Sequence, residues 1–220
     1  MDIIVTFVLI VGFIFLFVQG IMLANKYGWL KLENVLLLVI LAFIYEMLIL
    51  FIGKWVGEGN LLKILNYVRY WLHALITPLL ILVLWKLLYR ANIVWSKKIW
   101  VKLLVCLLTI GLIFYELVTG VFGIKLEKKW ENGILMYENI RDTGVPVMVI
   151  ILSIFILMTS LILWRKQKWP WLFFGILIMI VGSMITNSLN QTTLTNVFEW
   201  ILMYSFLVTK KFQDRHNNIS

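Results

Sequence analysis

Residues 34–55 read NVLLLVILAFIYEMLILFIGKW, an apolar run whose interior holds one ionisable residue, Glu46. A helix of about 20 mainly apolar residues spans the hydrocarbon core of a bilayer. Transmembrane β-strands alternate apolar and polar residues, and this run does not alternate. The stretch therefore predicts a membrane-spanning helix with a carboxylate inside it.

Six other stretches share this apolar character, and together the seven predict an all-α, polytopic membrane protein. They lie at about 3–24, 34–55, 67–89, 99–122, 145–164, 170–189 and 193–211. Only 14% of the 220 residues are charged and 62% are hydrophobic, which is too little charged cover for a soluble domain. We expect one transmembrane domain at 1–212 and a short cytoplasmic tail at 213–220. In the longest connection, we interpret Gly133-Ile-Leu-Met-Tyr137 as a segment lying along the membrane interface.

The distribution of basic residues predicts the orientation of the bundle, because cytoplasmic loops are enriched in Lys and Arg. With the N-terminus outside, the outer side holds Lys54, Lys63, Lys125, Lys128, Lys129 and Arg141. The inner side then holds Lys26, Lys31, Lys86, Arg90, Lys97, Lys98, Lys102, Arg165, Lys166, Lys168, Lys210, Lys211 and Arg215. We therefore predict an N-out, C-in multi-pass protein of the cell membrane, in a prokaryotic plasma membrane, with the lipid bilayer as its partner. Short basic clusters are typical of headgroup contact and do not indicate a nucleic-acid partner.

Five ionisable residues fall inside the predicted spans: Glu46, Arg69, His73, Glu116 and Glu199. Such residues cost about 2.5–3.5 kcal/mol each on insertion scales, and they face a partner or a water-filled cavity. At a rise of about 1.5 Å per residue, Glu46 lies roughly 13 Å below the outer end of its span. On the same rise, His73, Glu116 and Glu199 lie roughly 9 Å deep and Arg69 roughly 3 Å deep. All five are in the outer half, and the inner half has no comparable set.

The helical spacing of Arg69, His73 and Thr77 places these three side chains on one face of the third span. Pro78 follows directly and predicts a kink there. We predict an outward-opening polar pocket whose ligand-binding residues are Glu46, Arg69, His73, Thr77, Glu116 and Glu199. Two alternatives stay open: Arg69 and Glu116 extend to the headgroups, or Arg69 forms a purely structural ion pair with a buried glutamate.

The stretch Tyr67-Val-Arg69-Tyr70-Trp-Leu-His-Ala-Leu-Ile-Thr77-Pro78-Leu79-Leu80 resembles the third helix of the microbial, bacteriorhodopsin-like rhodopsins. That family has an Arg-Tyr pair followed at the same distance by Thr-Pro-Leu-Leu. Residues 197–206 can be laid alongside its seventh helix, and Glu199 then takes the place of its second counter-ion. The resemblance implies a seven-helix, N-out fold.

In the same alignment, Met203 occupies the position of the retinal-linking lysine. Leu72 replaces the primary counter-ion and Val83 the proton donor. Methionine forms no Schiff base, so bound retinal and light-driven pumping are not expected, and no other cofactor is predicted. A metal site is not expected either, because the chain has only two histidines, His73 and His216.

Three functions agree with this pattern. The first is a receptor-like or carrier-like bundle that binds a small ligand or ion in the outer pocket. The second is a membrane-embedded enzyme acting on a lipid or isoprenoid, with His73 as general acid/base and Glu199 or Glu46 as its catalytic partner. The third is a structural or accessory subunit whose buried charges only fix the packing of the helices.

Overall fold

The computed structural model describes residues 2–140, 146–189 and 192–216. Eight α-helices and one β-hairpin make up most of this part of the chain. The helices are α1 (Asp2–Tyr27), α2 (Val35–Val56), α3 (Asn60–Ile76), α4 (Leu80–Arg90), α5 (Ile99–Glu116), α6 (Val147–Gln167), α7 (Trp171–Leu189) and α8 (Thr192–His216). The strands are β1 (Leu126–Glu131) and β2 (Ile134–Asn139).

The seven stretches predicted as spans are helical throughout most of their described residues. Five helical segments are long and apolar enough to cross a membrane: Ile3–Tyr27, Leu32–Val56, Asn60–Arg90, Ile99–Val121 and Val147–Gln167. The apolar part of α7 is shorter, at Trp171–Thr186. Val145 and Arg141, which the predictions assigned to the fifth span and the outer side, lie outside the described residues. The apolar helices are compatible with an integral membrane protein.

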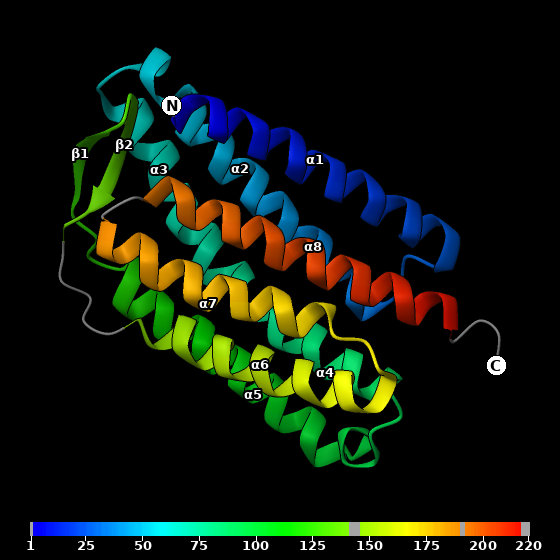
Figure 1. Ribbon diagram of the computed structural model, residues 1–220. Coiled ribbons are helices and arrows are strands. Elements are labelled where there is room, and N and C mark those ends of the chain that lie inside the picture. The colour runs from blue at the N-terminus through cyan, green and yellow to red at the C-terminus, as the bar shows by residue number, and fades with distance from the viewer. Residues whose placement is uncertain (1, 141–145, 190–191, 217–220) are drawn as a thin grey trace.

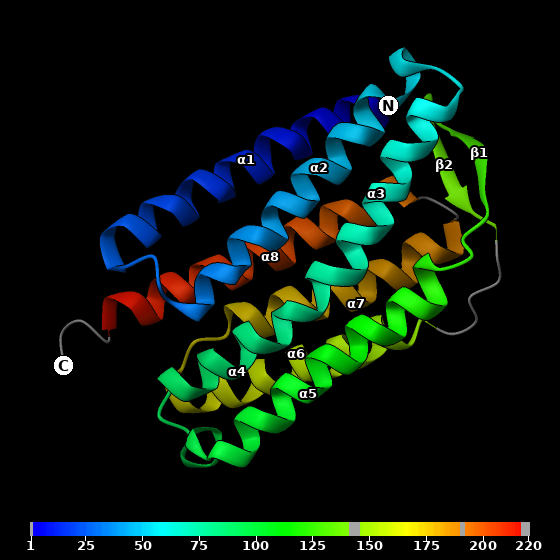
Figure 2. The same ribbon diagram turned by 180° about the vertical axis from the view of Figure 1, so that it is seen from behind.

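The predicted kink in the third span is confirmed. Pro78 lies in a 3-10 turn, Thr77–Leu79, that separates α3 from α4. Proline has no amide hydrogen to donate and its ring crowds the preceding turn, so the regular helix is interrupted there. Figure 2 shows α4 continuing the span beyond α3; both halves contact α2 and α5, and α4 also contacts α6 and α8.

The contacts between the helices close into a ring. Going around it, α1 packs on α2, α2 on α3, α3 on α5, α5 on α6, α6 on α7, α7 on α8, and α8 on α1. Helix α4, the second half of the span that begins with α3, contacts α2, α5, α6 and α8. Its side chains Ile81, Leu84 and Leu87 are completely buried. This half of the span is therefore more deeply buried than α3.

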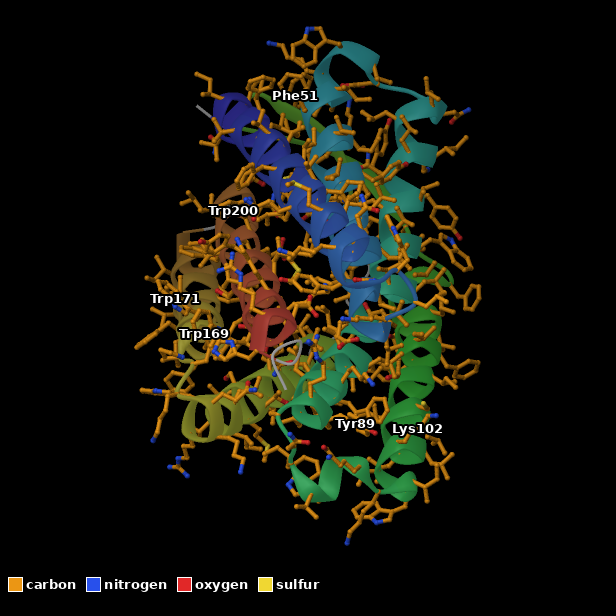
Figure 3. All side chains as sticks on the ribbon, turned by 90° about the vertical axis from the view of Figure 1, so that its right-hand side faces the viewer. Phe51, Tyr89, Lys102, Trp169, Trp171 and Trp200 are labelled. Carbon is orange, nitrogen blue, oxygen red and sulfur yellow. The ribbon has the colours of Figure 1, made fainter. Side chains whose placement is uncertain are left out.

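The outer faces of the helices are apolar. On α5, Leu107 is 74% exposed and Phe114 67% exposed, although both are large hydrophobic residues. Contiguous apolar exposure of this kind is a liability in water but suits contact with lipid tails. Trp55, Trp100 and Trp171 lie near helix ends, as is typical of a membrane-interface belt. Trp169 and Trp171 lie close together where α6 connects to α7, with ring centroids 6.4 Å apart (Figure 3).

The connection between α5 and α6 is a β-hairpin, so the prediction of an all-α chain is wrong in this segment. β1 and β2 pair antiparallel, with Glu131 opposite Ile134 across the turn. Asn132 and Gly133 have φ values of 48° and 89°, as a two-residue type I′ turn requires. The segment predicted to lie along the membrane interface is therefore the second strand. Its Leu135 packs against Ile49 of α2 and Leu62 of α3.

The hairpin lies at the end of the bundle where α1 begins, which we call the hairpin end (Figure 1). The described part of α8 ends at the opposite end, which we call the C-terminal end (Figure 1). Helix α8 continues to His216, beyond the residue expected to begin a tail. Gln213 and Asp214 are completely buried, so this last turn is packed into the bundle. Residues 217–220 of the expected tail lie outside the described residues.

Candidate functional site

A cavity of about 340 Å³ opens at the hairpin end, between α2, α3, α5 and the hairpin. It is lined by Glu46, Arg69, Tyr70, His73, Glu116, Gly120, Glu138 and Asn139. We call it the hairpin-end cavity. Four of the six residues predicted for the pocket therefore reach one space, although they come from three helices.

Arg69 and Glu46 form an ion pair at the centre of this cavity. The Nε atom of Arg69 lies 3.8 Å from Oε1 of Glu46, and the two side chains are 12% and 24% exposed. The Arg69 guanidinium also lies over the Tyr70 ring, 5.2 Å from its centroid. Its Nη2 atom donates to the Tyr70 hydroxyl at 3.5 Å. These are long contacts, so the guanidinium keeps donor capacity that another acceptor can use.

His73 and Thr77 lie one helical turn deeper. Nδ1 of His73 is 3.4 Å from Oγ1 of Thr77, a long hydrogen bond between side chains on the same helix face. Thr77, His73 and Leu72 border a small recess below the cavity, which Glu46 and Arg69 also line. Its volume is about 10 Å³, close to the space that one water molecule needs. The polar wall of the cavity therefore continues inward as far as the kink.

Glu116 enters the cavity from the last residue of α5. A π-helical turn, Leu117–Val121, follows it directly. Such turns are rare and frequently occur at functional sites. Gly120 faces the glutamate, because a Cβ atom there would lie 2.8 Å from Oε1 of Glu116. A larger residue at position 120 would therefore displace this carboxylate.

Glu199 is the member of the predicted set that stands apart. It lies on α8, is partly exposed, and interacts electrostatically with Glu46 and Arg69. The cavity walls, as far as the described residues define them, do not include it. The described side chains also form no hydrogen bond between His73 and Glu199. The structure thus brings Glu199 near the ion pair but not against the histidine.

The hairpin contributes Glu138 and Asn139, which the predicted site did not include. The backbone amide of Asn139 donates to the Tyr70 hydroxyl at 3.0 Å, so the end of β2 is attached to α3. Nζ of Lys129 lies 2.8 Å from Oε2 of Glu138. Burial disfavours the charged form of Lys129, but its hydrogen bonds to Glu138 and Glu131 outweigh this effect and raise its pKa. The sequence signal for this element is the Asn132-Gly133 pair, which favours a tight hairpin turn.

A second polar cluster lies at the C-terminal end, and four of its five residues lie just outside the predicted spans. Nη1 of Arg90 lies 2.9 Å from Oε1 of Glu33, and its Nη2 lies 2.8 Å from Oδ1 of Asp214. Lys210 contacts Oδ2 of Asp214 at 2.8 Å, and Lys31 contacts Oδ1 at 3.3 Å. We call these five residues the buried charge cluster. They join the α1–α2 connection, α4 and α8, and Asp214 has no exposed surface.

Of the three positions at which this chain departs from the rhodopsin pattern, two are buried and one borders the recess. Met203 is 1% exposed in the core, and Val83 is equally buried. Leu72 borders the recess beside His73. Among the described residues, no group of three or more His, Cys, Asp or Glu side chains is arranged to hold a metal ion.

No known protein family and no curated protein matches this chain. Its function is therefore inferred from the geometry of the two polar regions.

Proposed function

We propose that this chain is a seven-span, N-out, C-in membrane protein whose hairpin-end cavity binds a small ligand or ion, in the manner of a receptor or carrier. One observation carries the proposal. Glu46, Arg69, His73 and Glu116, which are costly in a membrane, all line one cavity. Packing alone has no need of an open polar space, whereas a binding site requires one.

The position of the ends supports the topology. The described chain begins at the hairpin end and finishes at the C-terminal end (Figure 1). An odd number of crossings produces this arrangement, and seven helical spans satisfy it. The excess of Lys and Arg on the loops at the C-terminal end supports a cytoplasmic location for that end. The hairpin-end cavity would open to the outside.

The cavity offers partners for charges of both signs. Arg69 has donor capacity left over from its long contacts, and Glu116 and Glu138 present carboxylate oxygens. A small polar molecule with a cationic group, an anionic group or both would therefore find complementary atoms there. The enzymatic alternative has less support, because the polar contact of His73 is with Thr77 and not with a carboxylate.

The experiment is a thermal-shift screen of the purified protein against a panel of small charged molecules. A molecule that binds only the folded state stabilises it by about 2.7 kcal/mol at 100 times its Kd. We expect at least one molecule to stabilise the wild type and to lose its effect on Glu46→Gln and Glu116→Gln. Glu127→Gln is the matched control, because this exposed acid lies on the hairpin outside the cavity. The proposal is wrong if every stabilising molecule raises the unfolding temperature equally in the wild type, the two cavity variants and the Glu127→Gln control.

A further inference from the structure

A groove of about 250 Å³ lies at the C-terminal end, between the last turns of α1 and α8. Figure 1 and Figure 2 both show these two helices side by side there. Three basic residues, Lys26, Lys211 and Arg215, line the groove together with the less polar Met22, Leu23 and Tyr27. It is far from the hairpin-end cavity and independent of the function proposed for that site.

The three basic side chains of the groove have no acidic partner among the described residues. Of the acids among the described residues, Glu33 lies in the α1–α2 connection and Asp214 near the end of α8. Both belong to the buried charge cluster, where other basic residues pair with them. Asp214 is next in sequence to Arg215, but its side chain is completely buried and pairs with Arg90, Lys210 and Lys31. Within the described part of the chain, the groove therefore carries three positive charges that no acidic side chain neutralises.

The apolar side of the groove continues along α1. Met22 is 64% exposed at the groove, and Val18, Phe15 and Val11 follow it with 49%, 53% and 53% exposure. Their spacing of three and four residues places them on one helix face. This face runs from the groove towards the middle of the bundle. A strip of this kind, beginning beside cationic side chains, matches an acyl chain that extends from a negative headgroup.

We propose that this groove binds the headgroup of an anionic phospholipid, with an acyl chain lying along the exposed face of α1. Arg215 is suited to bidentate contact with a phosphate, and Lys26 and Lys211 add point charges to it. Basic pockets between helices on the cytoplasmic side are a known type of acidic-lipid site. Tyr27, whose ring lies 5.4 Å from Nζ of Lys26, holds that lysine beside the groove.

The test is native mass spectrometry of the purified protein in detergent, with phosphatidylglycerol or phosphatidylcholine of identical acyl chains added. The wild type is expected to retain phosphatidylglycerol in preference to phosphatidylcholine. The triple variant Lys26→Gln, Lys211→Gln, Arg215→Gln is expected to bind phosphatidylglycerol roughly tenfold to a hundredfold more weakly at low ionic strength. The single variant Arg215→Gln should show an intermediate loss and should fold as the wild type does, because this side chain is exposed.

The matched control is Lys98→Gln, Lys102→Gln, Arg165→Gln, which removes the same charge from exposed positions at the same end of the bundle. It should keep the preference of the wild type. The inference is overturned if the wild type shows no preference for phosphatidylglycerol over phosphatidylcholine. It is overturned as well if the control loses as much binding as the groove variant, because the lipid would then be attracted by the overall positive charge of this end and not by the groove. It is also overturned if 10 mM inorganic phosphate displaces phosphatidylglycerol and chloride of equal ionic strength does not, since the site would then take the free anion.

Discussion

Replacing Asp214 by asparagine removes the central negative charge of the buried charge cluster and changes little else in shape. The carboxylate lies 2.8 Å from Arg90, 2.8 Å from Lys210 and 3.3 Å from Lys31. The substitution leaves these three cations with one remaining acid, Glu33, which contacts only Arg90 among them. The fold is therefore expected to lose stability because buried cations are left unpaired.

The size of the loss follows from the exposure of each partner. Lys31 is 31% exposed, so solvent strongly screens its attraction to Asp214. Lys210 and Arg90 are only 3% and 9% exposed, and their pairs with Asp214 are buried. Removing one member of a buried pair typically costs about 3–5 kcal/mol. We expect Asp214→Asn to lower the free energy of unfolding by about 3–5 kcal/mol, in the range for a buried pair.

The assay is equilibrium unfolding in mixed micelles, with the sodium dodecyl sulfate fraction raised and tryptophan fluorescence as the signal. The control is Glu58→Gln, which breaks an ion pair with Lys128 whose side chains are 49% and 60% exposed, and it should change stability little. The double variant Asp214→Asn, Lys210→Met should be more stable than Asp214→Asn alone, because it removes a cation left without its partner. A loss below about 1 kcal/mol for Asp214→Asn, the size expected of an exposed pair, would refute the reasoning.

Two further predictions concern the docking of the hairpin over the hairpin-end cavity. Gly53→Ala places a methyl group against the carbonyl oxygen of Leu135, so the hairpin must shift and a protease should cleave it faster. The control is Gly111→Ala, whose added methyl group faces open space and which should be cleaved like the wild type. Equal cleavage of the two variants would contradict the contact between Gly53 and Leu135. Tyr70→Phe removes the acceptor of the Asn139 amide, a hydrogen bond worth about 1 kcal/mol, so hydrogen exchange at that amide should accelerate roughly fivefold. An unchanged exchange rate would show that this bond does not hold the hairpin closed.

The helices and the main residues of the cavity were predictable for physical reasons. Continuous apolar runs identify membrane helices, and Pro78 marks a break because proline cannot continue the backbone hydrogen bonding. The fixed rise of a helix converts residue number into depth, so Glu46, Arg69, His73 and Glu116 could be expected in the same half of the bundle. Depth alone does not give rotation about the helix axis, and this is why Glu199 was predicted to line the pocket but lies beside it.

The hairpin and the buried charge cluster were missed for different reasons. The Asn132-Gly133 pair signalled a turn, but the short apolar segment after it was interpreted as lying along the membrane interface. Glu138 was consequently left out of the site. Arg90 and Asp214 lie near the ends of their predicted spans, where a charge normally reaches water. Their pairing depends on how α4 and α8 pack, and no local pattern in the sequence encodes that contact.

The most direct test of the hairpin-end cavity is the accessibility of His73. In a Cys106→Ser background, His73→Cys should react with a membrane-impermeant thiol reagent applied to intact cells, because position 73 lines the cavity that we propose opens to the outside. Thr159→Cys, at a buried position on α6, should remain unlabelled under the same conditions. Labelling of His73→Cys only after the cells are permeabilised, or only after the protein is unfolded, would contradict the account.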